Sequence, residues 1–435
     1  MAIASPNTTA STTSAPSTGQ SYGAPLATVT TLFFMWGFLT CLNDILVPHL
    51  KAIFDLNYTR VMLIQFAFFG AYFIFSIPSA KIIDWMGYQR SMVLGLLTMG
   101  VGAFLFVPAA SAPSYPLFLG ALIVLAAGIT CLQVAANPYV TVLGKPETAS
   151  SRLNLTQAFN SLGTFLAPFF GGLLILSSAP KTADQIRAMA PDAALAYRLH
   201  EAATVKMPYV GLGIALVLLA VAIGTFKLPK IEHAQHKVGE KVNDSIWKHP
   251  NLIFGAIAIF VYVGAEVSIG SFLVNYFAQP EIGGLTEKVA ASFVAFYWGG
   301  AMVGRFIGSA LLQKMKTGGL LGICAVCAAG LVAISMLTSG HFAMYSIILV
   351  GLFNSVMFPS IFTLGVAELG PLTGDGSGIM IMAIVGGAII PVAQGWIADH
   401  IGIHHAFFLP VICYVYILFF ALSGSKPNSE RYAKA

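Results

Sequence analysis

The chain has 435 residues, of which 57% are apolar and only 9% are charged, and its mean hydropathy is +0.81. Soluble domains average about 25% charged and about 45–50% apolar residues, so a water-soluble fold is excluded. The apolar runs are continuous and often exceed about 18 residues, enough for a helix to cross a bilayer and unlike the alternating segments of a membrane β-barrel. The net charge of +5 is spread over loops, which indicates no nucleic-acid binding. A polytopic helical membrane protein is predicted.

The first 25 residues are rich in Ser, Thr, Ala and Pro and hold no Lys or Arg, which predicts a disordered tail rather than a signal peptide. Twelve apolar segments then predict transmembrane spans near 27–54, 61–83, 90–110, 116–143, 153–178, 208–227, 251–279, 289–312, 318–338, 342–367, 376–398 and 405–423. The longest polar interruption, 228–250, divides them into two sets of six. We expect a cytoplasmic tail at 1–25, a six-helix bundle at 26–227, a cytoplasmic linker at 228–250, a second six-helix bundle at 251–425 and a tail at 426–435.

The Lys and Arg residues are distributed unequally between the two sides. With twelve spans, both ends of the chain lie on one side of the membrane. The loops on that side and the C-terminal tail hold fourteen of the 22 Lys and Arg residues, and the opposite loops hold seven. The positive-inside rule therefore predicts that both termini and the linker are cytoplasmic.

The two halves also share patterns of glycine and proline. A Gly-x4-Pro-x3-Gly pattern that begins at Gly163 recurs at Gly386, and a Pro-x5-Gly pattern that begins at Pro138 recurs at Pro359, with offsets of 223 and 221 residues. Two patterns at nearly one offset indicate duplication. Six spans repeated in parallel are the architecture of major facilitator transporters, whose substrates bind between the halves near the membrane midplane. We therefore expect an all-α fold of two pseudo-symmetric six-helix bundles.

Two acidic residues lie within predicted spans, Asp44 in the first and Glu266 in the seventh. They are 222 residues apart, so the duplication predicts equivalent places in the two halves. A buried carboxyl is costly in lipid and often faces a cavity, a partner or a proton path. We therefore take Asp44 and Glu266 as candidates for proton coupling. The alternative is a carboxyl that only bonds neighbouring backbone or amides.

Buried amides and an aromatic residue form the candidate substrate site. Amides both donate and accept hydrogen bonds, and aromatic rings stack on the apolar faces of sugars, so the set favours a neutral polyol. The candidates are Trp36, Asn43, Gln133, Asn137, Gln157, Asn160, Asn275 and Gln394. Amides also join helices in lipid, which is the alternative for each of them. Carriers of phosphate or carboxylates would need cations in the pore, and Arg305 is the only Lys or Arg deep within a predicted span, away from its ends.

Residues 82–90 (Ile-Ile-Asp-Trp-Met-Gly-Tyr-Gln-Arg) resemble the major facilitator signature between the second and third spans, although Ala80 stands where the family pattern begins with Gly. The resemblance implies a cytoplasmic turn at which Asp84 and Arg90 make charge contacts that hold the outward-facing state together. We assign conformational gating to these two residues and to Arg152 and Arg305.

Longer motifs resemble the fucose:proton symporter family, and most closely its bacterial glucose/galactose transporter branch. They are Trp-Gly-Phe at 36–38, Asn-Asp at 43–44, Ala-Ala-Asn-Pro-Tyr-Val-Thr-Val-Leu-Gly at 135–144, and the segments 151–163, 262–276 and 304–309. The resemblance implies a carrier in the bacterial cytoplasmic membrane that imports a monosaccharide with a cation. It also implies coupling and sugar binding at Asp44, and sugar contacts at Gln157 and Asn160. A second family acid is replaced by Gln133, which cannot titrate.

We therefore expect a glucose/galactose-type hexose carrier that works by proton symport and alternating access. Sodium coupling, uncoupled facilitation, export of amphipathic compounds and sugar sensing without transport are the alternatives. We expect a monomer in the lipid bilayer that uses no cofactor or metal and is not an enzyme, because no metal-ligand cluster or nucleophile–base pair emerges from the sequence.

Overall fold

The computed structural model describes residues 22–54, 58–111, 114–174, 185–186, 188–204, 206–231 and 244–427, and every regular element in these ranges is a helix. Within these described residues, ten segments are long and apolar enough to cross a membrane. One of them, Ile64–Ser111, contains two helices that meet at Gly87, whose φ of 82° is open to glycine but costly for other residues. Helix α4 (Ala149–Leu174) completes the twelve predicted spans.

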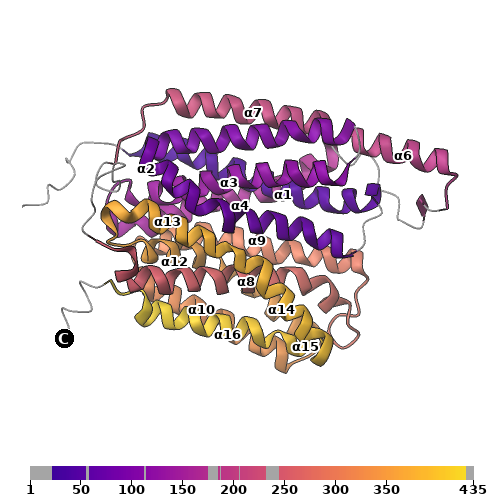
Figure 1. Ribbon diagram of the computed structural model, residues 1–435. Helices are drawn as coiled ribbons and strands as arrows, with labels where there is room; N and C mark the ends of the chain where they lie inside the picture. Colours follow the sequence, from indigo (N-terminus) through magenta and orange to yellow (C-terminus); the bar gives the residue numbers. More distant parts are fainter. Residues whose placement is uncertain are drawn as a thin grey trace, which may run out of the picture.

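The first half contains α1 (Gly23–Phe54), α2 (Tyr58–Ser111), α3 (Tyr115–Val142), α4, α6 (Pro191–Thr204) and α7 (Lys206–Thr225). Its spans are the indigo-to-magenta helices of Figure 1, which lie beside one another along one side of the molecule. Helix α6 was not predicted from the apolar pattern, and it lies at the end of the bundle away from the C-terminus (Figure 1).

The second half contains nine α-helices. They are α8 (Pro250–Ala278), α9 (Glu287–Leu311), α10 (Thr317–Leu337), α11 (Gly340–Asn354), α12 (Met357–Gly365), α13 (Thr373–Met382), α14 (Gly386–Ile401) and α16 (Phe408–Phe419), with the short α15 (Ile403–Ala406) before the last. Single-turn helices lie at Pro146–Thr148 in the first half, at Ile246–Lys248 in the linker, and at Gly370–Leu372 and Ala383–Val385 in the second half, where a π-helical turn follows α16 at Phe420–Gly424. The helices of the second half, salmon to yellow, lie on the other side of the molecule, next to the first half (Figure 1).

The tenth span, expected to be continuous over 342–367, is interrupted. Helix α11 ends at Asn354 and α12 begins at Met357. Pro359 explains part of the break, because it lacks the backbone N–H that would bond the carbonyl of Ser355 four residues earlier. The eleventh span is also divided, into α13 and α14, by the turn at Ala383–Val385.

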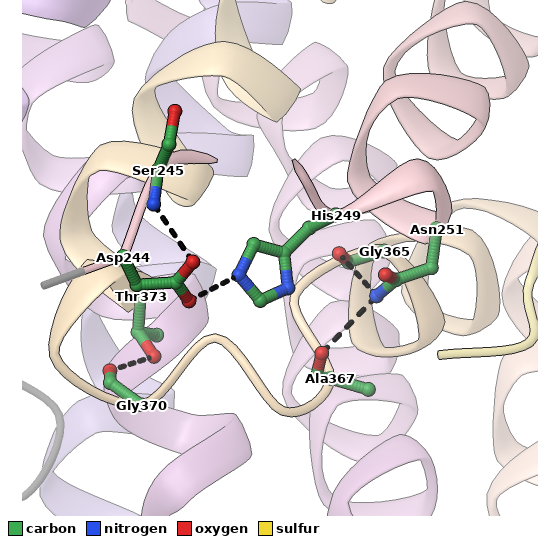
Figure 2. Close-up of polar contacts among 8 residues, drawn as sticks. All are labelled: Asp244, Ser245, His249, Asn251, Gly365, Ala367, Gly370 and Thr373. Atoms are coloured by element: carbon green, nitrogen blue, oxygen red, sulfur yellow. Dashed lines mark hydrogen bonds and ion pairs between the residues drawn. The ribbon is translucent and has the colours of Figure 1, made fainter. Parts of the chain in front are cut away.

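The end of the linker is fixed to the second half just before α8. His249 Nε2 lies 2.7 Å from Asp244 Oδ2, and the backbone N–H of Ser245 donates to Asp244 Oδ1 (Figure 2). These hydrogen bonds, chiefly the one with His249, lower the pKa of Asp244 below its ordinary value. The Asn251 side-chain amide donates to the carbonyls of Gly365 and Ala367 at 3.1 Å, so the start of α8 holds the end of α12 (Figure 2).

Candidate functional site

Three of the predicted amides come together in the first half. Gln157 on α4 donates to Asn137 Oδ1 on α3 at 3.5 Å, and both side chains are buried. Asn160, one turn further along α4, donates to the carbonyl of Phe33 on α1 at 2.9 Å. Trp36 is buried on the same helix, with its ring centroid 4.4 Å from that of Phe33. Helices α1, α3 and α4 therefore bring Trp36 and these amides into one group.

Glycine makes this grouping sterically feasible. A Cβ on Gly37 would lie 2.2 Å from the carbonyl oxygen of Asn160, and a Cβ on Gly163 would lie 2.3 Å from the carbonyl oxygen of Phe34. Helices α1 and α4 approach so closely that only hydrogen atoms fit between them at these two positions. The backbone of α1 consequently accepts the Asn160 hydrogen bond directly.

The amide group keeps unused hydrogen-bonding capacity. Asn137 is fully buried, and its Nδ2 has no hydrogen-bond partner among the described residues. A buried polar group without a partner is unfavourable, so such an atom is a donor available to a ligand or to water. This arrangement can bind hydroxyl groups without supplying a charge.

Gln133 takes a different partner from the other amides. It donates from Nε2 to the hydroxyl of Tyr72 on α2 at 2.8 Å, and both side chains are buried. Tyr72 was not predicted from the sequence, because tyrosines in membrane helices are commonly interfacial anchors. The neutral Gln133–Tyr72 pair stands where the resembled family carries an acid.

The side chains of Asn43 and Asp44 lie outside the described residues, although the backbone of α1 continues through both.

In the second half, Glu266 belongs to a network of tyrosines. The Tyr262 hydroxyl lies 2.8 Å from Glu266 Oε1 and 3.1 Å from the carbonyl oxygen of Asn354. Asn354 is fully buried; its amide donates to the Tyr297 hydroxyl at 2.9 Å and its Oδ1 accepts from Tyr414 at 2.8 Å. Tyr262 and Tyr414 were not predicted from the sequence, but the four-residue spacing of Tyr262 from Glu266 places both on one helix face and is a signal that could have found it.

The other two predicted second-half contacts lie apart from this network. Asn275 is exposed on α8. Gln394 is fully buried on α14, and neither of its polar atoms has a partner among the described residues. Ile390 on α14 packs against Gly264 on α8. One helical turn further along both helices, Gln394 lies level with Ser268, whose buried hydroxyl also has no partner among the described residues.

The two halves are joined by polar contacts on the side of the molecule where α1 begins. Ser151 and Ser309 each donate to the other's carbonyl, at 2.7 and 3.1 Å, and Ser150 lies 2.6 Å from the Thr363 hydroxyl. Arg305 Nη1 donates across the same seam to the carbonyl of Gln157 at 3.4 Å. These contacts close the molecule on that side.

The predicted gating residues contribute unequally to this seam. Lys81 Nζ lies 2.7 Å from Asp375 Oδ1 in the second half and 3.5 Å from Asp84 Oδ2, so Lys81 is the described ion-pair partner of Asp84 and links it to the other half. Arg90 is exposed and makes no ion pair with the residues that the structure describes. Arg152 stays within the first half, where it donates to the carbonyls of Thr141 at 2.9 Å and Lys145 at 2.8 Å and so caps the end of α3.

Comparison with known proteins agrees with this architecture. The family model of the Major Facilitator Superfamily matches residues 26–384. The chain is 54% identical over 410 residues to the glucose/galactose transporter of Brucella abortus biovar 1 (strain 9-941), covering 94% of this chain and 96% of that protein. It is 36% identical over 409 residues to the L-fucose-proton symporter of Escherichia coli (strain K12), covering 92% of this chain and 93% of that protein.

A solved structure extends the likeness to three dimensions. The crystal structure of the Major Facilitator Superfamily transporter FucP in the outward conformation matches with a TM-score of 0.85 at 34% sequence identity, over 94% of this chain and 100% of that one. The predicted fold of twelve helices in two halves is confirmed. The relatives are transporters rather than enzymes. The chain belongs to the Major Facilitator Superfamily, in the group of sugar transporters that contains these relatives.

Proposed function

We propose that this protein imports a monosaccharide of the glucose/galactose type together with a proton, by alternating access, across the cytoplasmic membrane of a bacterium. The observation that carries the proposal is the buried amide group of Asn137, Gln157 and Asn160, in which Asn137 Nδ2 has no partner among the described residues and Asn160 bonds the carbonyl of Phe33, on whose ring Trp36 packs. Neutral donors and acceptors match sugar hydroxyls, and the aromatic ring matches a sugar's C–H face. The 54% identity to a named glucose/galactose transporter supports the substrate class.

The conformation fits one stage of such a cycle. If both termini are cytoplasmic, as the distribution of Lys and Arg predicts, the closed seam at Ser151 and Ser309 lies on the cytoplasmic side. The central site then opens to the outside. The likeness to a structure described as outward supports this assignment. Breaking the seam and closing the opposite side would deliver the sugar inward.

Asp44 is our first candidate for the coupling group. Protonation of a carboxyl in the membrane removes the unfavourable charge before the halves close around it. Gln133 cannot take part, because an amide does not titrate, so Asp44 acts alone or together with Glu266. Reciprocity requires the proton to raise sugar affinity by the same factor by which sugar raises proton affinity. The named L-fucose-proton symporter supports a proton rather than sodium as the coupling ion.

The experiment is labelled-sugar uptake into proteoliposomes that contain the purified protein. Glucose, galactose, mannose and fucose are offered under an imposed pH gradient, an imposed sodium gradient or no gradient. We expect accumulation of glucose or galactose only with the inward proton gradient. Accumulation driven by sodium alone would replace the proton in the proposal, and equilibration without accumulation would mean facilitation. Transport of amphipathic drugs with no sugar uptake would refute the sugar assignment.

Two variants examine the residues. Asp44→Asn should keep sugar exchange and lose gradient-driven accumulation, because exchange needs no net proton movement. Gln157→Leu should weaken sugar binding about two- to tenfold, the effect of one lost hydrogen bond. Full accumulation by Asp44→Asn would refute its coupling role. The matched control is Gln313→Leu, which removes an exposed amide at the end of α9 and should change neither measurement.

A further inference from the structure

Two backbone carbonyls lie at the break between α11 and α12, within a membrane span. Each of them accepts a hydrogen bond from a side chain on another helix. The carbonyl of Asn354 accepts from the Tyr262 hydroxyl on α8 at 3.1 Å. The carbonyl of Ser355 accepts from Arg305 Nε on α9 at 3.4 Å. An unbonded carbonyl is costly in lipid, so these two side chains stabilise the interruption.

Arg305 also holds the first half. Its Nη1 donates to the carbonyl of Gln157 at 3.4 Å and to the Ser161 hydroxyl, and its own carbonyl accepts from Asn154 Nδ2 at 2.6 Å. The glycine that follows one turn later permits this contact, since a Cβ on Gly308 would lie 2.8 Å from Asn154 Nδ2. One guanidinium group therefore connects the break in the tenth span to α4, the helix that carries Gln157 and Asn160.

A cation within a membrane span is costly without a counter-charge, and Glu266 is the candidate for it. Glu266 lies close enough to Arg305 for its carboxylate to be stabilised electrostatically, although the two side chains form no ion pair within 4.0 Å. Tyr262 bridges the acid to the break, because its hydroxyl contacts both Glu266 Oε1 and the carbonyl of Asn354. Tyr297 is a further neutral group beside the acid, with its hydroxyl donating to the Glu266 carbonyl at 3.3 Å. Charge balance at this place thus depends on Glu266 and Arg305 together.

We propose that Glu266 is the counter-ion of Arg305, and that the pair, bridged by Tyr262, forms a clamp that holds the interrupted tenth span against α4. Glu266 is then a positioning residue, and Asp44 alone carries the coupling proton. The inference rests on the proposed function in taking α4 as the sugar-contacting helix. The charge pairing itself does not depend on the identity of the substrate.

The test is a charge-rescue experiment with Glu266→Gln, Arg305→Met and the double variant. Each single variant leaves one charge without its partner in the membrane, so we expect sugar exchange and proton-driven accumulation to fall together by about tenfold or more. The double variant removes both charges, so both activities should rise above those of the worse single variant, while the lost hydrogen bonds of Arg305 keep them below those of the parent. Lys314→Met removes an exposed charge three residues beyond α9 and is the control for charge loss alone.

Thermal unfolding of the same variants in detergent provides a readout that needs no substrate. We expect both single variants to unfold at lower temperature and the double variant to return toward the parent. If a single variant does not reach the membrane, its membrane abundance is compared with that of the double variant. A higher abundance of the double variant again supports the pair.

Two results would overturn the clamp. The first is a double variant whose transport activity, unfolding temperature and membrane abundance are no higher than those of the worse single variant. The other is a Glu266→Gln variant that keeps full exchange and loses only accumulation, since that pattern marks a proton carrier. Absence of any hexose transport by the parent would refute the proposed function instead, and the stability rescue would still decide the pairing.

Discussion

Replacing Gly37 with alanine perturbs the contact between α1 and α4 that positions the candidate sugar site. The added Cβ would lie 2.2 Å from the carbonyl oxygen of Asn160 and 2.6 Å from its Nδ2. Carbon and oxygen atoms in contact normally stay about 3.3–3.6 Å apart. The two helices must therefore separate by roughly 1 Å, because the nearest atom belongs to the backbone and cannot rotate away.

The expected size of the effect follows from two opposing terms. Overpacking of this kind costs about 1–3 kcal/mol. Alanine in a helix regains about 0.5–1 kcal/mol relative to glycine. We expect a net destabilisation of about 1–2 kcal/mol. The separation also pulls Asn160 away from the carbonyl of Phe33, so sugar affinity should fall about two- to tenfold.

The measurements are thermal unfolding in detergent and equilibrium binding of labelled sugar. The matched control is Gly120→Ala on α3, where an added Cβ would meet no atom within 4 Å. The control should be as stable as the parent or slightly more stable, with unchanged affinity. A Gly37→Ala protein that matches the control in both stability and affinity would refute the argument that this close approach positions the site.

Three further predictions concern the seam and the linker. Cysteines at Ser151 and Ser309, whose hydroxyl oxygens are 3.4 Å apart, should form a disulfide on oxidation that stops transport reversibly. Each single cysteine variant is the control. Normal transport by a fully cross-linked protein would exclude opening of this seam. Asn251→Ala removes hydrogen bonds that hold the end of α12 and should destabilise the protein by about 1–3 kcal/mol in a thermal unfolding assay, whereas an unchanged midpoint would mean that other groups hold this end. Because the pKa of Asp244 is lowered in the folded state, its bond with His249 stabilises the fold above the ordinary carboxyl pKa, and this stabilisation is lost as the pH falls through the folded-state pKa. Proteolysis of the linker should therefore accelerate at low pH in the parent and be insensitive to pH in Asp244→Asn. Equal pH profiles of the two proteins would contradict this.

The helical membrane fold could be predicted from the sequence because its determinants are local. Apolar length sets each span, and the Gly and Pro patterns at nearly equal offsets indicate the duplication. The grouping of Gln157 with Asn160 was also accessible, since residues three apart share a helix face. The interruption of the tenth span was not predicted, although Pro359 was visible, because proline is often tolerated within membrane helices.

What the sequence determined by itself is the class of fold, its twelve spans and the small set of polar residues within them, because a bilayer excludes polar groups that have no role or partner. What only the tertiary structure decided is which of those residues meet. It brought Asn137 to Gln157, Gln133 to Tyr72 and Lys81 to Asp375, pairs separated by 20, 61 and 294 residues. Such contacts depend on helix rotation and on close approaches at single glycines such as Gly37, and neither is encoded in the hydrophobic pattern of one helix.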